Sequence, residues 1–206
     1  MKTVSDLYKN YLERFHTRIQ TGQFVGRRVL DVGCGEGLDA KMIGKYATSV
    51  VGIDVNASIS WKKLENKKLL FKLADAHRLP FKKGVFDGVF IKDVLHHVER
   101  PKQVLSEIKR VTKKEGRVII VEANRYNPIF YFHMTKMLGH NHFSHKQFTA
   151  LVGQSFPSAH IYTFESHFVP LQSDLFRSLI SGGIETIFSM PFAEKIRSYN
   201  IAYINV

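Results

Sequence analysis

The strongest indication of the fold class is the stretch Val29-Leu30-Asp31-Val32-Gly33-Cys34-Gly35-Glu36-Gly37. A short apolar run leads into three glycines at alternate positions, and an amphipathic run follows from residue 38 to residue 46. A strand that turns sharply through glycines into a helix is typical of a nucleotide cleft in an α/β sheet. Glycine allows positive φ angles there and lets a ligand approach the bare backbone. The stretch therefore predicts a nucleotide-binding loop.

The spacing of the glycines discriminates between classes of nucleotide. A dinucleotide loop follows the pattern G-x-G-x-x-G, whereas here the third position of that pattern holds Leu38. A phosphate loop needs Gly-Lys-Ser/Thr, which this loop lacks. Asp31 and Glu36 would repel a pyrophosphate and suit a cationic amino-acid group. The loop therefore disfavours phosphate ligands, and Leu38 also argues against a nicotinamide-dependent oxidoreductase.

Strands and helices alternate along the chain. The expected strands cover residues 28–32, 50–54, 69–73, 86–91, 118–121, 160–168 and 199–206. The expected helices cover residues 1–22, 38–46, 58–67, 94–98, a segment from Pro101 to Gly116, then 128–138, 144–152 and 171–188. Strands that are apolar on both faces and alternate with helices indicate a parallel sheet covered on both sides.

This pattern predicts a doubly wound α/β fold with a seven-stranded, mostly parallel sheet. No convincing linker interrupts it, so we expect residues 1–206 to form a single domain. Residues 1–22 form its N-terminal helix, with Thr3 or Ser5 as the N-cap. A helical cap over the substrate site is expected within residues 124–198.

Composition indicates the cellular location and the classes of partner that suit the protein. No apolar run approaches the ~20 residues that span a bilayer, and the first residues show no apolar signal core with a cleavage site, so we expect no secretion. Cys34 is the single cysteine, which excludes an internal disulfide and suits a reducing compartment, so we expect a cytoplasmic protein. The net charge of +12 could attract nucleic acid, anionic lipid or an acidic substrate. Because the lysines are scattered, nucleic acid is disfavoured, whereas contact with an anionic membrane and the oligomeric state stay open.

Two acidic residues follow the second and third expected strands. Asp54 ends the second strand, where a carboxylate can accept both ribose hydroxyls. Asp75 lies one strand further out between Ala74 and Ala76, where it can accept from an adenine amine. The alternatives are a helix cap for Asp54 and a turn for Asp75.

Five motifs in this order resemble the class I S-adenosylmethionine-dependent methyltransferases, and among these the small-molecule group that includes quinone-biosynthesis methyltransferases. They are Leu30–Gly37, Gly52-Ile53-Asp54, Ala74-Asp75-Ala76 with Leu79-Pro80-Phe81, Phe86-Asp87, and Val94-Leu95-His96-His97-Val98. The resemblance implies the Rossmann-like methyltransferase fold, S-adenosyl-L-methionine as cofactor and S-adenosyl-L-homocysteine as product. It fades after Glu122, where such enzymes usually build substrate specificity.

The resemblance also implies roles for individual residues. The loop would approach the methionine part, with Asp31 organising its amino group, while Asp54 holds the ribose and Asp75 the adenine. Lys92, just past the fourth strand, would face cofactor or substrate. The expected cofactor-binding residues are Asp31, Gly33, Cys34, Gly35, Gly37, Asp54, Val55, Asp75, Ala76 and Lys92.

Histidines form two groups in the sequence. His96 and His97 fall near the expected methyl-transfer site, where one could act as a general base, although they could also pack or cap. The second group could bring imidazoles together as metal ligands, but no cysteine accompanies it and its spacing crosses a loop. We therefore expect no metal site there. This group comprises His133, His140, His142 and His145.

The sequence thus predicts a methyltransferase that acts on a small, apolar or amphiphilic acceptor. The aromatic-rich last third supports an apolar pocket. The N-terminal helix, with Tyr8, Tyr11 and Phe15, could fold over the cofactor as a lid or simply pack. A non-catalytic S-adenosylmethionine-binding protein and, behind it, a nucleic-acid methyltransferase are the alternatives.

Overall fold

A seven-stranded sheet forms the centre of the computed structural model, which describes residues 3–128, 131, 141–168, 171 and 173–206. The strands are β1 (Arg28–Val32), β2 (Ser49–Asp54), β3 (Leu69–Leu73), β4 (Phe86–Lys92), β5 (Thr112–Ala123), β6 (His160–Phe164) and β7 (Tyr199–Asn205). Their order is β3-β2-β1-β4-β5-β7-β6. Neighbours pair in parallel except at β7, which runs antiparallel to β5 and β6. The expected mostly parallel sheet is confirmed.

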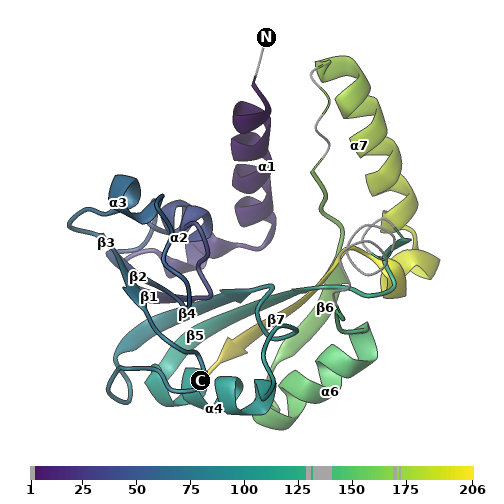
Figure 1. Ribbon diagram of the computed structural model, residues 1–206. Helices are drawn as coiled ribbons and strands as arrows, with labels where there is room; N and C mark the ends of the chain where they lie inside the picture. Colours follow the sequence, from purple (N-terminus) through teal and green to yellow (C-terminus); the bar gives the residue numbers. More distant parts are fainter. Residues whose placement is uncertain (1–2, 129–130, 132–140, 169–170, 172) are drawn as a thin grey trace.

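Helices cover both faces of the sheet, which makes the fold doubly wound (Figure 1). The helices are α1 (Val4–Arg18), α2 (Leu38–Ile43), α3 (Trp61–Leu64), α4 (Pro101–Val111), α6 (His145–Ser155) and α7 (Asp174–Ser189), with 3-10 turns η1 (Thr21–Phe24) and η3 (Pro191–Ile196). In Figure 1, α1, α2 and α3 lie above the sheet, whereas α4 and α6 lie below it.

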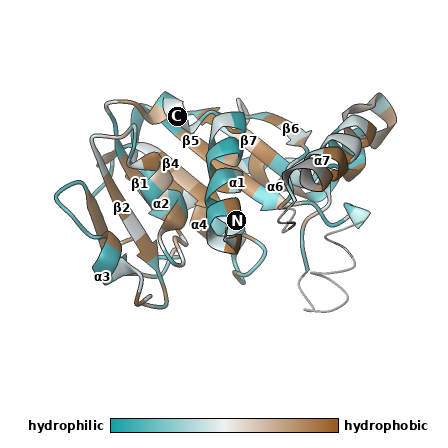
Figure 2. Ribbon diagram, turned by 90° about the horizontal axis from the view of Figure 1, so that it is seen from above, coloured by the Kyte–Doolittle hydropathy of each residue, from teal (hydrophilic) through white to brown (hydrophobic). Residues whose placement is uncertain are grey.

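Two apolar layers hold the helices to the sheet. The upper layer packs Phe15 of α1 and Ile43 of α2 against strand residues such as Phe90. The lower layer packs Ile108 of α4 and Phe148 of α6 against the opposite strand faces. Each fully buried Phe, Leu or Ile side chain contributes about 1.5–3 kcal/mol. Because helices as short as α2 are marginal alone, this packing rather than helix propensity holds them. Figure 2 shows brown, hydrophobic stretches on the strands, interrupted by teal, hydrophilic positions.

Side-chain caps define where two helices begin. At α1 the hydroxyl of Thr3 accepts from the backbone N–H of Asp6 at 3.1 Å, and the Asp6 carboxylate accepts from the Thr3 N–H at 3.0 Å. Thr3 is therefore the N-cap, with the reciprocal pattern of a capping box. Ser144 and Gln147 make the same arrangement at α6. α1 ends at Arg18 instead of residue 22, and Gln20 takes a left-handed conformation just beyond it.

Two expected helices differ from the structure. Of residues 58–67, only Trp61–Leu64 is helical, because the Asn66 side chain accepts from the Lys68 N–H and turns the chain. Residues 94–98 form a turn, closed by a bond of 2.9 Å from the His97 N–H to the Val94 carbonyl. Here the buried Glu122 carboxylate accepts two backbone N–H groups and holds the chain in a non-helical path.

Other element boundaries shift by a few residues. β5 begins at Thr112, before the expected residue 118, because Phe86 pairs with Thr112 ahead of a register shift in β4. β6 ends at Phe164 instead of residue 168, and α2 ends at Ile43. The helix expected over 128–138 falls largely outside the described residues. None of the helices in the described ranges has both the length and the apolar character needed to cross a membrane.

Candidate cofactor site

The glycine loop leaves β1 where the strand order of the sheet reverses. β1 pairs with β2 on one side and β4 on the other, so the carboxyl ends of these parallel strands diverge around the loop. Such a reversal opens a crevice in which α/β proteins bind ligands. The Cys34 N–H donates to the Ile53 carbonyl at 2.9 Å and fastens the loop to the end of β2.

Each loop glycine has positive φ, but their surroundings differ. A Cβ on Gly33 would lie 2.2 Å from Cγ2 of Val94, and one on Gly37 would lie 2.5 Å from the Phe71 ring. A Cβ on Gly35 would meet no described heavy atom within 4 Å. Gly33 and Gly37 therefore permit close packing of the protein, whereas Gly35 leaves space that a ligand can fill.

The Asp54 carboxylate holds the loop in place. One oxygen accepts from the Gly35 N–H at 2.9 Å, and the other accepts from the Asn56 N–H at 3.0 Å. Asp54 does not cap α3, whose N-cap is Ser60. Since each carboxylate oxygen has two acceptor positions, Asp54 can still accept from ribose hydroxyls while it bonds the backbone.

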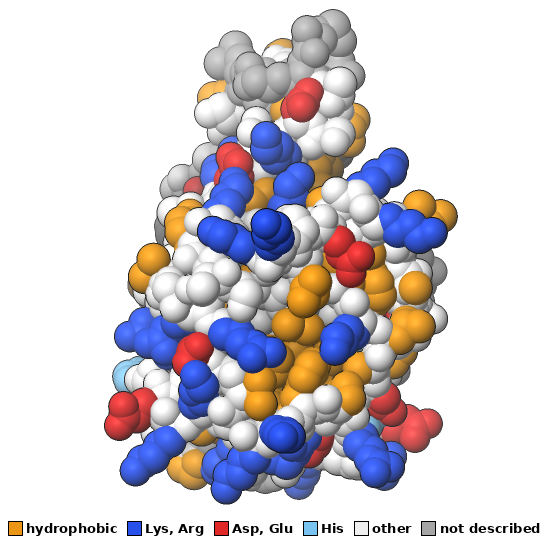
Figure 3. Space-filling model, turned by 90° about the vertical axis from the view of Figure 1, so that its left-hand side faces the viewer, with side chains coloured by type: hydrophobic (Ala, Val, Ile, Leu, Met, Phe, Trp, Pro, Cys, Tyr) orange, Lys and Arg blue, Asp and Glu red, His pale blue; other side chains and the backbone are white. Residues whose placement is uncertain are grey.

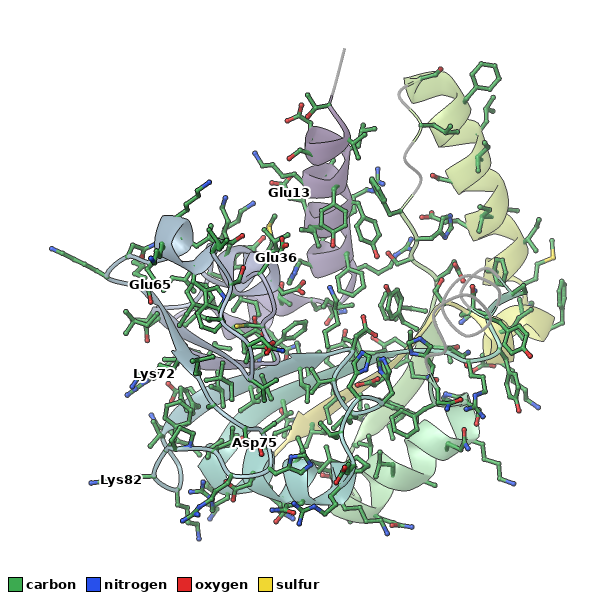
Figure 4. All side chains as sticks on the ribbon, viewed as in Figure 1. Glu13, Glu36, Glu65, Lys72, Asp75 and Lys82 are labelled. Atoms are coloured by element: carbon green, nitrogen blue, oxygen red, sulfur yellow. The ribbon has the colours of Figure 1, made fainter. Side chains whose placement is uncertain are left out.

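Two cavities flank the loop. The larger, about 480 Å³, lies among the ends of β1 to β4 and is lined by Gly33, Asp54, Val55, Asp75, Ala76, Asp93 and His97, among others. The smaller, about 280 Å³, shares Gly33 and is lined also by Tyr8, Cys34, Gly35, Glu36, Leu38 and Asp39. Figure 4 shows Glu36 on the α1 side of the sheet and Asp75 on the other side. Cavities of this size suit a small organic ligand.

Comparisons with known proteins agree with this geometry. A family described as a methyltransferase domain matches residues 30–120. A demethylmenaquinone methyltransferase of Renibacterium salmoninarum is 31% identical over 148 residues, which cover 70% of this chain and 60% of the relative. Residues 30–120 therefore carry a methyltransferase domain, and the chain is similar to class I S-adenosylmethionine-dependent methyltransferases. It spans about half the length of the curated relatives it matches.

Two further likenesses bear on this methyltransferase family. A tRNA U34 carboxymethyltransferase of Pseudomonas aeruginosa is 38% identical over 102 residues, covering 46% of this chain and 32% of the relative. An S-adenosylmethionine-dependent methyltransferase from Mesorhizobium loti shares the fold with a TM-score of 0.68 at 13% identity, covering 92% of this chain and 96% of its own.

The residues around the loop fit the cofactor of this family. Neither cavity has a lysine or arginine among its described lining residues, so both suit hydroxyl, amine and cationic groups better than phosphate. Asp31 is buried beneath the loop, and its Oδ2 has no hydrogen-bond partner among the described residues. Burial and the nearby Asp39 raise the pKa of Asp31 well above its ordinary value. A cationic ligand group beside the loop would favour its charged form.

The expected contacts divide into those that line a cavity and those that do not. Gly33, Asp54, Val55, Asp75 and Ala76 line the larger cavity, and Gly33, Cys34 and Gly35 line the smaller one. Asp75 also accepts from the N–H and the ring of His77 at 2.8 and 2.7 Å, so it closes a turn as well. Asp31, Gly37 and Lys92 line neither cavity.

Lys92 lies behind the smaller cavity, paired with an acidic residue that lines it. Its Nζ bonds the Asp39 carboxylate at 2.8 and 3.1 Å and lies 4.9 Å from the centre of the Phe15 ring. His16 bonds the same carboxylate at 2.8 Å. Burial lowers the pKa of Lys92, but the Asp39 charge outweighs it and the net shift is upward. Lys92 therefore joins α1 and α2 to β4.

The histidine pair divides between the cavity wall and the core. His97 is exposed on the wall of the larger cavity. The His96 side chain is only 1% exposed, and its Nδ1 lies 2.6 Å from Oε2 of the fully buried Glu122. The ring centroid of His96 lies 3.9 Å from that of His97 and 4.2 Å from that of His142. Glu122 was not among the expected residues, although an acid directly after an apolar strand could have signalled it.

Asp93 completes the polar cluster at the end of β4. It has a φ of 54°, and its carboxylate accepts from the Ala123 N–H at 2.9 Å. Burial and the Glu122 charge raise the pKa of Asp93 to about 6. Ligand atoms of Asp93, His96 and Glu122 lie within 4.8 Å of one another, and both carboxylates also accept hydrogen bonds from within the protein.

The second histidine group is only partly described. His145 bonds Asn200 at 3.0 Å, and His142 lies against His96. His133 and His140 lie outside the described residues.

Proposed function

We propose that this chain binds S-adenosylmethionine across the two cavities that flank Gly33. Asp54 and Val55 would hold the ribose, Asp75 and Ala76 the adenine, and the loop the methionine part. The observation that supports this most strongly is the larger cavity, whose lining includes groups from the ends of four strands. These groups offer acceptors for hydroxyls and an amine, which is the chemistry that this cofactor requires.

We further propose a small, apolar or amphiphilic methyl acceptor. Tyr8 borders the smaller cavity, and its ring lies 5.3 Å from that of Phe168 and 5.8 Å from that of Tyr11. Tyr11 and Phe15 pack in the core, so Tyr8 is the residue of the three suited to act as part of a lid. This aromatic wall supports an apolar acceptor, as does the menaquinone precursor named for the Renibacterium relative.

The chain contributes to methyl transfer mainly by positioning. S-adenosylmethionine supplies an electrophilic methyl group, so the protein need not provide a covalent nucleophile. Holding the acceptor in line and excluding water can supply about 7–11 kcal/mol of the barrier. His97 would accept a proton from acceptors that carry one, with Glu122 and His96 holding the turn in which His97 lies.

Turnover tests this proposal. The purified protein is incubated with methyl-labelled S-adenosylmethionine and a panel of quinones, lipids, small metabolites and tRNA. We expect label in a small apolar acceptor, and strong loss of transfer in His97→Gln with S-adenosylhomocysteine binding retained. His160→Gln, at an exposed histidine of β6, is the matched control and should transfer normally.

Two outcomes would contradict the proposal. Cofactor binding without transfer to any acceptor would favour a non-catalytic binding protein. Label found in tRNA alone would assign the site to a nucleic-acid substrate.

A further inference from the structure

Four exposed aliphatic side chains come from the edge strand β3 and from residues 55–59, which follow β2. β3 is the outermost strand beside β2, and Leu73 pairs with Asp54, so Val55 follows directly beside the end of β3. The exposed fractions are 65% for Val55, 86% for Ile59, 48% for Leu70 and 62% for Leu73. We call these four residues the β3 patch.

Basic residues surround the β3 patch. Residues 55–83 contain eight lysines and arginines, all exposed, and two acidic residues, so this segment carries half of the net charge of +12. Figure 3 shows hydrophobic side chains gathered on this side of the molecule with Lys and Arg around them, and in Figure 4 Lys72 and Lys82 point away from the body. The basic residues are Lys62, Lys63, Lys67, Lys68, Lys72, Arg78, Lys82 and Lys83.

Protection of the sheet edge explains only part of this arrangement. Lysines on an edge strand prevent pairing with other strands. They do not require aliphatic side chains beside them, and single exposed apolar residues are ordinary only when scattered. An apolar centre ringed by positive charge instead has the chemistry of a surface that meets anionic lipid.

The side-chain types favour lipid over nucleic acid. Unpaired bases are held by stacking on exposed aromatic rings. Trp61, the aromatic residue of α3, is buried and stacks on Phe71 with ring centroids 5.2 Å apart. The patch itself is aliphatic, and aliphatic side chains gain from entering the acyl boundary of a bilayer.

We propose that the β3 patch docks the protein on an anionic membrane surface. Its aliphatic side chains enter the headgroup region, and the surrounding lysines meet the lipid charges. Val55 belongs to both the patch and the wall of the larger cavity, so docking brings the rim of that cavity to the bilayer. An amphiphilic acceptor could then be drawn from the membrane; this last step rests on the proposed function, whereas docking does not.

α7 provides a matched comparison. Phe176, Leu179, Ile180 and Ile187 are exposed on it by 62, 61, 43 and 54%. The helix itself carries two acidic residues and one basic residue, whereas residues 55–83 around the β3 patch carry eight basic residues and two acidic ones. Because its apolar side chains are also exposed but its own net charge is not positive, α7 serves as the control surface.

Co-sedimentation with vesicles tests the docking proposal. Vesicles of phosphatidylcholine with phosphatidylglycerol are compared with phosphatidylcholine alone, at low and high salt. The variants are Ile59→Asp/Leu73→Asp in the patch, Lys72→Gln/Lys82→Gln around it, and Leu179→Asp/Ile187→Asp on α7. Retained binding of S-adenosylhomocysteine, or an unchanged circular dichroism melt, checks that each variant is folded.

We expect the wild type to bind only the anionic vesicles, and less at high salt. The lysine variant should bind about 25-fold more weakly, at about fivefold per lysine, and the patch variant about tenfold or more. The α7 variant should bind as the wild type does.

Three results would overturn the proposal. The first is that the wild type does not bind anionic vesicles at low salt. The second is that the α7 variant loses binding while the patch variant keeps it. The third is that tRNA abolishes vesicle binding while the patch variant still binds. None of these depends on methyl transfer, so docking and the proposed function can fail separately.

Discussion

Gly33 and Gly35 lie two residues apart in one loop, yet a side chain would meet different surroundings at each. At Gly33 it would collide with Val94, whereas at Gly35 it would enter the space of the smaller cavity. The first glycine is needed for folding of the loop, and the second leaves room for the ligand.

Alanine substitutions should separate these two roles. Gly33→Ala should destabilise the fold by about 2–4 kcal/mol through overpacking and a left-handed backbone. Gly35→Ala should lower the free energy of unfolding by only about 1 kcal/mol, because its backbone is left-handed. It should weaken S-adenosylhomocysteine binding about tenfold or more. Chemical denaturation and calorimetric titration measure the two effects. Gly35→Ala protein that binds like the wild type would show that the cofactor does not approach this residue.

Asp93 predicts how cofactor binding depends on pH. Burial and Glu122 raise its pKa from 3.8 to about 6, so its protonated form contributes stability at low pH that is lost as pH rises through about 6. A cationic ligand favours the ionised carboxylate. The affinity for S-adenosylmethionine should therefore rise as pH increases through about 6. Below pH 6, binding should release the proton of the Asp93 carboxyl group.

Titration in buffers of different ionisation enthalpy measures this release. Asp93→Asn should bind more weakly and lose the pH step. A flat wild-type profile across this range would contradict the assignment of Asp93 to the cavity wall.

At the scale of elements, Asp39 joins three parts of the fold. It lies at the start of α2, accepts from His16 of α1 and pairs with Lys92 at the end of β4. Burial raises its pKa, but Lys92 and His16 outweigh burial and hold it below its ordinary range. Tyr8 of the same α1 borders the smaller cavity, so this junction also positions a cavity wall.

Removing the Asp39 charge should loosen this junction. Asp39→Asn leaves Lys92 without its counter-charge in a site where its side chain is 16% exposed. We expect a loss of about 3 kcal/mol in the free energy of unfolding, measured with denaturant. Glu13→Gln is the matched control, because its pair with Lys45 is exposed and should contribute nothing measurable. Equal stability of both variants would contradict a structural role for the junction.

The sequence predicts strands better than short helices, for a physical reason. β1 and β3 lie where their apolar runs indicate, because burial on a sheet leaves a clear pattern. The turn at 94–98 has a helix-like sequence. Its path is set by the Glu122 carboxylate, 28 residues after Val94, which accepts from the backbone N–H groups of Val94 and Leu95. Local patterns do not contain such long-range bonds.

For the whole molecule, the part of the site that follows from local sequence patterns could be predicted, whereas the part that depends on long-range bonds could not. Gly33, Asp54 and Asp75 follow strands directly, so parallel topology alone brings them to one edge of the sheet. Lys92 ends β4 in the same way, yet its side chain bonds Asp39 and lines neither cavity. Which of several charged partners a side chain takes depends on packing between elements, and sequence spacing does not determine it.

Calorimetric titration of S-adenosylmethionine and S-adenosylhomocysteine into the intact wild type and Asp54→Asn shows whether the protein holds this cofactor through the Asp54 carboxylate. The wild type should bind both ligands. The variant should lose about 1.5–3 kcal/mol, as expected for hydrogen bonds to a charged acceptor, or about 10- to 150-fold in affinity. Absence of heat with either ligand in folded wild-type protein would contradict the cofactor site. Equal binding by Asp54→Asn would contradict the role given to this carboxylate.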